Sequence, residues 1–239
     1  DLPIDPYVMG AWLGDGTSGA ATITTHPDDY EILTRFTDAG YNVRKTANKY
    51  AWSFSDKGAY IKNLKELGVY RDKHIPMTYL RSGIEQRRNL LRGLLDTDGH
   101  ISENGVVTID LCNEKLAQGL VELVRSLGGR ITLRKRPATL NGVIVGDRWR
   151  MTIRVVDFNP FFLSRKASRW SPPTNQASRH TQRTIVSVER IPTRATKCVQ
   201  VSNSSHLFLA GASMTPTHNS YLTALLICWW VDTRYPDCF

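Results

Sequence analysis

Two aspartates whose carboxylates could do chemistry stand at matched places in the chain, each directly before a glycine. Asp15 closes the stretch YVMGAWLGDG, from Tyr7 to Gly16, and Asp98 lies near the end of RRNLLRGLLDTDGHI, from Arg87 to Ile101. An aspartate before glycine can simply terminate a helix. Because the two stretches share this ending, we favour a common chemical role for the pair over two unrelated helix ends.

Each aspartate is expected at the end of a helix. In the second stretch the apolar residues recur with the i, i+1, i+4, i+5 spacing of one helical stripe, at Leu90, Leu91, Leu94 and Leu95. Gly93 lies inside this helix, where glycine costs roughly 1 kcal/mol relative to alanine, which suggests that another backbone approaches closely. Gly10 has the same place in the first stretch. We therefore predict that two helices meet at their glycines as a pseudo-two-fold pair.

Both stretches resemble the LAGLIDADG (dodecapeptide, or DOD-type) signature of homing endonucleases, and LRGLLDTDG, from Leu91 to Gly99, is the closer copy. The resemblance implies two helices that pack face to face through small residues. It also implies that Asp15 and Asp98 point out of the helix ends, bind catalytic Mg²⁺ and support hydrolysis of double-stranded DNA.

A lysine is expected beside each aspartate. Lys73, in the sequence KHIP, resembles a block that intein endonucleases carry before their second motif, and this resemblance implies a catalytic cation. A cation there could polarise the attacking water or stabilise the negative charge of the transition state. The pseudo-symmetry points to Lys166 as the partner of Lys73 in the second half.

The order of elements repeats around the two motifs, as helix, strand, helix, strand, strand. The offset between the two aspartates is too long for a solenoid unit and suits a duplicated half-domain. We predict an α+β fold, and the resemblance implies two half-domains with saddle-like antiparallel sheets over residues 1–165, divided at about 83/84. Strands are expected at 20–25, 41–46, 50–54, about 101, 106–111, 130–136 and 148–156, with further helices at 27–39 and 113–127.

Basic side chains recur at every second position of two expected strands, so they line one face of a sheet. Such rows could contact guanine edges and phosphates in the major groove of double-stranded DNA, although they also occur on ordinary solvated faces. The first half contributes Arg44, Lys45 and Lys49 at the corresponding place. The predicted DNA-binding residues of the second half are Arg130, Arg134, Arg136, Arg148, Arg150 and Arg154.

A second chemistry is indicated at His218-Asn219-Ser220, which resembles the C-terminal splice junction of an intein. The resemblance implies that the Asn219 side chain attacks its own backbone carbonyl, closes a succinimide and breaks the bond to Ser220. The Ser220 hydroxyl would first accept the upstream acyl group, and His218 would donate a proton or hydrogen bond to the carbonyl.

The same resemblance assigns the rest of the C-terminal region. Residues 184–219 are β-rich and are expected to be the C-terminal splicing segment, with His206 in a His-Leu-Phe element and Cys198 where the family usually has aspartate. Residues 166–183 are polar and basic and indicate a linker or a DNA-contacting segment. Residues 220–239 would begin the host protein, and they resemble the start of a phage terminase large subunit ATPase.

The resemblance lacks the N-terminal splicing half of an intein. Such an intein begins with a nucleophilic cysteine or serine, whereas this chain opens with Asp1-Leu2-Pro3. Either the chain is a fragment of a longer product or that half is supplied separately. We expect the missing half and the host exteins as partners.

The composition of the 239 residues suits a basic, cytoplasmic protein. The 31 Lys+Arg against 22 Asp+Glu give a net charge of +9, which favours polyanionic partners, although many basic proteins bind no DNA. The four cysteines have no paired metal spacing and no secretory context, so reduced thiols are expected. The longest apolar run, 221–231, is too short to span a bilayer. We expect a monomer without membrane association.

Two other functions stay open on the sequence. A relic of the same fold could bind DNA or RNA without cutting, or assist splicing as a maturase does, and the intact Asp15 and Asp98 favour the enzyme over it. An ATPase fragment would rest on residues 220–239 alone.

Overall fold

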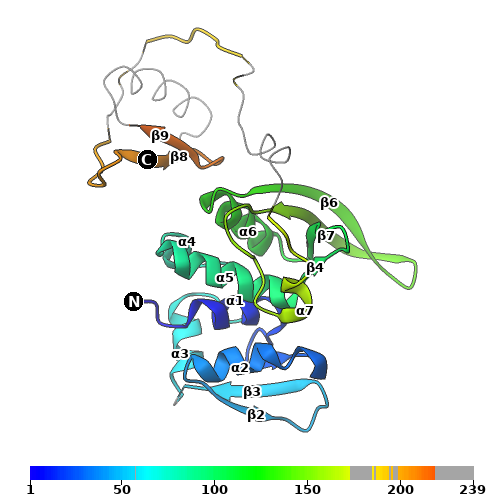
Figure 1. The fold of residues 1–239 in the computed structure, drawn as a ribbon. Coiled ribbons are helices and arrows are strands. Elements are labelled where there is room, and N and C mark those ends of the chain that lie inside the picture. Colours follow the sequence, from blue (N-terminus) through cyan, green and yellow to red (C-terminus); the bar gives the residue numbers. More distant parts are fainter. Residues whose placement is uncertain (57, 173–184, 186, 194, 196–198, 219–239) are drawn as a thin grey trace. The chain divides into compact units, whose positions relative to one another are not determined.

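The computed structural model describes residues 1–56, 58–172, 185, 187–193, 195 and 199–218 (Figure 1). The chain divides into two compact units, Asp1–Ser178 and Arg179–Phe239, which are described separately. Among the described residues, no helix is long and apolar enough to cross a membrane.

Two neighbouring helices, α1 (Pro6–Asp15) and α5 (Ile84–Thr97), form the centre of the first unit (Figure 1). The Asp5 side chain caps α1 by accepting hydrogen bonds from the Tyr7 and Val8 amides at 2.9 and 3.1 Å. These two amides have no acceptor within the helix, so the cap fixes where α1 begins.

The first half of this unit contains a three-stranded antiparallel sheet in the order β1-β3-β2. Helix α2 is amphipathic and buries Ile32, Leu33 and Phe36, and the rings of Phe36 and Phe54 lie 4.8 Å apart between helix and sheet. The elements are β1 (Thr22–Thr24), the 3-10 helix η1 (Pro27–Asp29), α2 (Glu31–Asp38), β2 (Asn42–Lys45), β3 (Ala51–Ser55), α3 (Ala59–Glu66) and α4 (Met77–Leu80).

The second half repeats this arrangement with a four-stranded antiparallel sheet in the order β4-β5-β7-β6. Helix α6 covers one face of it, as α2 does in the first half (Figure 1). The elements are β4 (Gly99–Ile101), β5 (Val107–Leu111), α6 (Glu114–Ser126), β6 (Arg130–Leu140), β7 (Val143–Arg154) and α7 (Ser164–Ala167). The mixture of helices and antiparallel sheets in two repeated halves agrees with the predicted α+β class.

The hairpin of β6 and β7 is longer than the sequence analysis predicts. The strands were expected to lie at 130–136 and 148–156, but β6 continues to Leu140 and β7 starts at Val143. Asn141 and Gly142 join them with φ angles of 49° and 81°. Asparagine followed by glycine adopts this left-handed pair readily, so the dipeptide is the sequence signal for the extended hairpin.

One predicted boundary differs in the structure. The first unit continues beyond residue 165, because Lys166 is buried and Trp170 packs against the core. The polar sequence of 166–183 suggested a linker, but the long apolar parts of lysine and tryptophan side chains can be buried while their polar ends find partners.

The second unit contains a two-stranded antiparallel hairpin of β8 (Leu207–Ala210) and β9 (Thr215–His218). Residues 184–191 and 197–203 belong to the segment that was expected to be β-rich. Their described residues form no strand. A strand needs a partner with which to pair, and β8 and β9 pair with each other.

Candidate functional site

The two central helices touch through their glycines, as predicted. A β-carbon on Gly10 would overlap the Leu90 carbonyl oxygen, and one on Gly93 would overlap the Tyr7 carbonyl oxygen. Leu90 and Tyr7 occupy equivalent places in the two motifs, so the contact is reciprocal, as a pseudo-two-fold pair requires. This close approach brings the C-terminal ends of α1 and α5 side by side.

The close approach places the carboxyl groups of Asp15 and Asp98 within hydrogen-bonding reach of each other. Both side chains are exposed to solvent on one side, while the helix ends around them remove part of their water. This loss of water, followed by the charge of Asp15, raises the pKa of Asp98 to about 6. Loss of water also raises the pKa of Asp15, which accepts the hydrogen bond from protonated Asp98.

The pair has the charge and chemistry of a divalent cation site. The two carboxyl groups repel each other when both are ionised. The C-terminal ends of two helix dipoles add further negative potential at the same place. Mg²⁺ often binds through one or two carboxylates, with its other positions filled by water and substrate phosphate. The described residues contain no group of three or more His, Cys, Asp or Glu side chains that could hold a metal ion, so the protein would supply two carboxylates here. Asp15 and Asp98 therefore fit the predicted Mg²⁺.

Lys73 lies at the end of α1. Its ammonium donates hydrogen bonds to the carbonyl oxygens of Gly14 and Gly16 at 2.8 and 2.6 Å. Partial burial lowers the pKa of Lys73 to about 8, although the charges of Asp98 and Asp15 oppose this shift. An ammonium has three N–H groups, so one remains after these two bonds for a ligand on the open side.

Lys166 occupies the equivalent place at the end of α5, as the pseudo-symmetry predicts. It is 5% exposed, and burial lowers its pKa to about 8. Its ammonium lies 2.6–3.2 Å from four carbonyl oxygens, those of Leu95, Asp96, Thr97 and Gly99. Four acceptors saturate its three N–H groups, so Lys166 stabilises the helix end and has no donor left for a substrate.

Asp96 is a buried carboxylate that sequence reasoning missed. It accepts a hydrogen bond of 2.8 Å from the Tyr7 hydroxyl and bonds of 3.1 Å from the Phe162 and Leu163 amides. Burial raises the pKa of Asp96 to about 6. These bonds fasten the segment before α7 to α5 and so hold Lys166 in place. The sequence did contain a signal for this role. Asp96 is the first acid in LLDTDG, where the first motif has the apolar Leu13 at the equivalent position.

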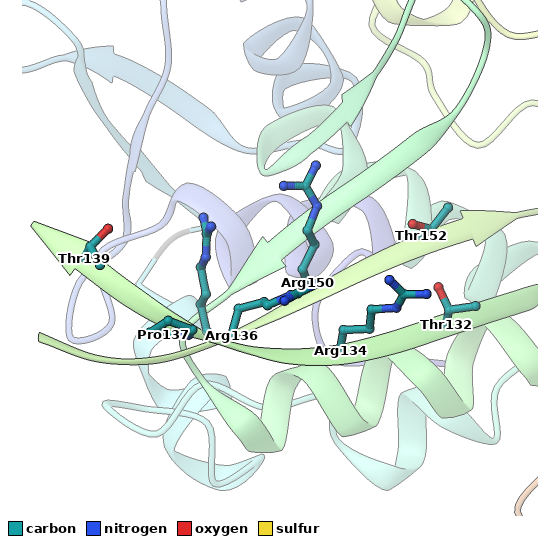
Figure 2. A pocket seen from close by; sticks show the side chains of 8 residues that line it. Thr132, Arg134, Arg136, Pro137, Thr139, Arg150 and Thr152 are labelled. Atoms are coloured by element: carbon teal, nitrogen blue, oxygen red, sulfur yellow. The ribbon is translucent and has the colours of Figure 1, made fainter. Parts of the chain in front are cut away.

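The predicted arginine rows of β6 and β7 lie on one face of the sheet. Cross-strand pairing joins Arg130 with Arg154, Arg134 with Arg150, and Arg136 with Arg148, while Thr132 pairs with Thr152. Figure 2 shows Arg134, Arg136 and Arg150 along the two strands, between the threonine pair and the Pro137–Thr139 end. These side chains line an open groove whose positive charge suits a polyanion such as DNA.

Part of the chain matches a known protein family. Residues 74–159 match the homing endonuclease family. The matched segment includes α5, Asp98 and the whole β6–β7 hairpin, but ends before Lys166.

Two curated relatives are both described as replicative DNA helicase DnaB. The protein from Mycobacterium intracellulare is 38% identical over 228 residues, which are 93% of this chain and 37% of that protein. The protein from Mycobacterium leprae is 53% identical over 38 residues, 16% of this chain and 6% of the relative. The chain thus spans little more than a third of the length of the first relative.

Two solved structures of the homing endonuclease I-DmoI are also similar, each with a TM-score of 0.42 and 15% identity. Mesophilic variants match over 64% of this chain and 89% of theirs. A variant in complex with its target DNA in the presence of manganese matches over 70% of this chain and 90% of its own.

The first half departs from the predicted DNA-binding set. Successive residues of a strand point to opposite faces, so Arg44 and Lys45 cannot share one. Arg44 pairs with Ser53 on the polar face, whereas Lys45 pairs with Trp52 on the helix-covered face, with its ammonium 5.7 Å from the Trp52 ring. Lys49 lies in the turn between β2 and β3. The first sheet therefore contributes Arg44 alone from this set to its open face.

In the second unit, two of the predicted splicing residues lie together. The rings of His206 and His218 are edge to face with centroids 6.2 Å apart, because Leu207 pairs with His218 across the β8–β9 hairpin. Cys198, Asn219 and Ser220 lie outside the described residues.

Proposed function

We propose that this chain is the homing endonuclease and C-terminal splicing region of an intein, and that it cuts both strands of double-stranded DNA at a specific site with Mg²⁺. The observation that carries the proposal is the pair of carboxylates, Asp15 and Asp98, at the joined ends of the two glycine-packed helices. Both half-sites belong to one chain, so a monomer is sufficient for the reaction.

In this mechanism the sheet of β6 and β7 binds the DNA, and the side chains at the ends of α1 and α5 support its cleavage. The arginine rows hold the DNA backbone and base edges so that one phosphate of each strand lies at the helix ends. Asp15 and Asp98 would hold Mg²⁺ there, which supplies activation of water and stabilisation of the developing phosphate charge. The remaining N–H of Lys73 is placed to donate to the attacking water or to a phosphate oxygen.

The relatives' name suggests the target to test. We would incubate the full chain with a plasmid that carries an uninterrupted replicative DNA helicase gene, with and without Mg²⁺. Linear plasmid should form only with Mg²⁺ and only when the gene is present. Binding without cutting would instead support the alternative, a relic or maturase of the same fold. The earlier expectation of a terminase host has no support from the relatives' names, and the 220–239 tail lies outside the described residues.

We also propose that the C-terminal segment releases the residues after Asn219. His206 and His218 lie together and His218 directly precedes Asn219 in the sequence, and either imidazole could donate a proton to the carbonyl under attack. Mass spectrometry of the aged protein should show slow loss of residues 220–239, and Asn219→Ala should prevent it. Equal loss from the Asn219→Ala protein would mean ordinary proteolysis. Addition of the N-terminal splicing half should accelerate the release, because it would position these groups better.

A further inference from the structure

The end of the β6–β7 hairpin carries a group of exposed apolar side chains with no role in the site described above. Leu140, Val143, Ile144 and Val145 are 64%, 64%, 67% and 62% exposed. Leu140 and Val143 pair across the strands and share one face, whereas Ile144 points to the other, so this end of the hairpin is apolar on both faces. Exposed apolar side chains are ordinary when they are scattered, but four at the end of one hairpin indicate a binding surface. We call residues 137–146 the arm.

The arm continues the hairpin beyond the rest of its sheet. Strand β5 pairs with β7 from Trp149 to Ile153, so in β7 the arm has only β6 as a neighbour. In Figure 1 the arm projects past the other strands of the second half. It therefore meets its partner as a two-stranded ribbon, a shape that the major groove of B-DNA can admit.

The sequence of the arm, PATLNGVIVG, contains no charged residue, whereas the hairpin directly before it carries the paired arginine rows. Charged side chains contact phosphates, and apolar ones contact the methyl group of thymine in the major groove. A ribbon that is basic along its length and apolar at its end is thus suited to lie along one duplex, with its end against bases rather than phosphates.

We propose that the arm reads thymine methyl groups at the outer end of the DNA site, a specificity element that rests on the DNA-cutting function proposed above. The arm extends from the Arg136–Arg148 pair to the Leu140–Val143 pair, about 13 Å at the usual rise of a strand. At ~3.4 Å per base pair this covers about four base pairs beyond those that the arginines contact. Thymine is expected within this block.

The experiment removes the methyl groups from the DNA and the apolar groups from the protein. The site is first selected from random duplex DNA with the full chain. Uracil then replaces thymine in the outer block, which deletes only the methyl group and keeps base pairing. Binding by the wild-type protein should weaken about fourfold for each contacted methyl, the ratio expected when one apolar carbon loses its contact.

The protein variant replaces all four side chains by glutamine, and Val106→Gln, at another exposed valine, is the matched control. The arm variant should bind thymine and uracil duplexes equally and lose its sequence preference in the outer block only. Its thermal unfolding should match that of the wild type, because the four side chains are exposed and make no part of the core. The Val106→Gln protein should still distinguish the two duplexes.

Three results would overturn the proposal for the arm. Wild-type binding could be indifferent to uracil, or the arm variant could keep the wild-type preference. The variant could also convert a dimer to a monomer in sedimentation, in which case the arm contacts a second copy of the chain. In all three cases cleavage of the selected site would continue. A wild-type protein that selects no site and cuts no DNA would instead refute the function on which the proposal rests.

Discussion

Replacement of Asp98 by asparagine should abolish DNA cleavage and, in the absence of divalent cations, should stabilise the folded protein at pH 7.5. The side chain keeps its shape and its hydrogen bond to Asp15, because the amide can donate as the protonated carboxyl does. It loses the negative charge that would hold Mg²⁺. Binding to DNA should persist, since the arginine rows are unchanged.

The size and sign of the stability change follow from the pKa of Asp98, which rises from 3.8 to about 6 on folding. A raised pKa means that the folded state binds the proton more tightly than the unfolded state. The stability that this proton gives is fully present below about pH 4 and is lost as the pH rises to about 6. Two pKa units correspond to about 3 kcal/mol. Because the carboxyl is exposed to water, which screens the repulsion, we expect about 1 kcal/mol, or roughly 2–4 °C in melting temperature.

The assay is thermal unfolding of both proteins in EDTA between pH 4 and 8, followed by the same measurement with Mg²⁺. The wild-type protein should lose stability between pH 4 and 6 relative to Asp98→Asn, and Mg²⁺ at pH 7.5 should stabilise the wild type alone. Asp157→Asn, at an exposed aspartate outside the helices and strands, controls for the chemistry of the substitution. Lower stability of Asp98→Asn in EDTA at pH 7.5 would refute the repulsion argument, and cutting at the wild-type rate would refute the metal site.

Three further predictions follow from the same contacts. Gly93→Ala should destabilise the protein by about 2–3 kcal/mol in urea unfolding, because the new β-carbon meets the backbone of α1. Lys73→Met should slow cutting roughly a hundredfold with little change in stability, whereas Lys166→Met should lower stability first, since four carbonyl oxygens lose their donor. Arg134→Ala and Arg150→Ala should each reduce the salt slope of DNA binding by about 1, measured by titration at several salt concentrations.

The sequence predicted those parts of the molecule that depend on local pattern or on the repeat. The leucine stripe and the two glycines predicted the central helices and their contact, and strand alternation predicted the arginine face of β6 and β7. The hydrogen bonds of Asp96 could not be predicted, because its partners Phe162 and Leu163 are far away in the chain. Strand alternation separates Arg44 from Lys45, but only the pairing with Ser53 and Trp52 shows which of the two lies on the helix-covered face.

The ends of α1 and α5 differ in a way that the repeated sequence pattern does not reveal. Residues that match by position carry different hydrogen-bond partners: Lys73 contacts two carbonyl oxygens and Lys166 contacts four. The extra contacts exist because Asp96 anchors the segment that carries Lys166, and the first motif has Leu13 in its place. A lysine with a remaining N–H can serve a reaction, while a saturated one serves the fold. Equivalence in the repeat therefore predicts where a residue lies, and its partners decide what it does.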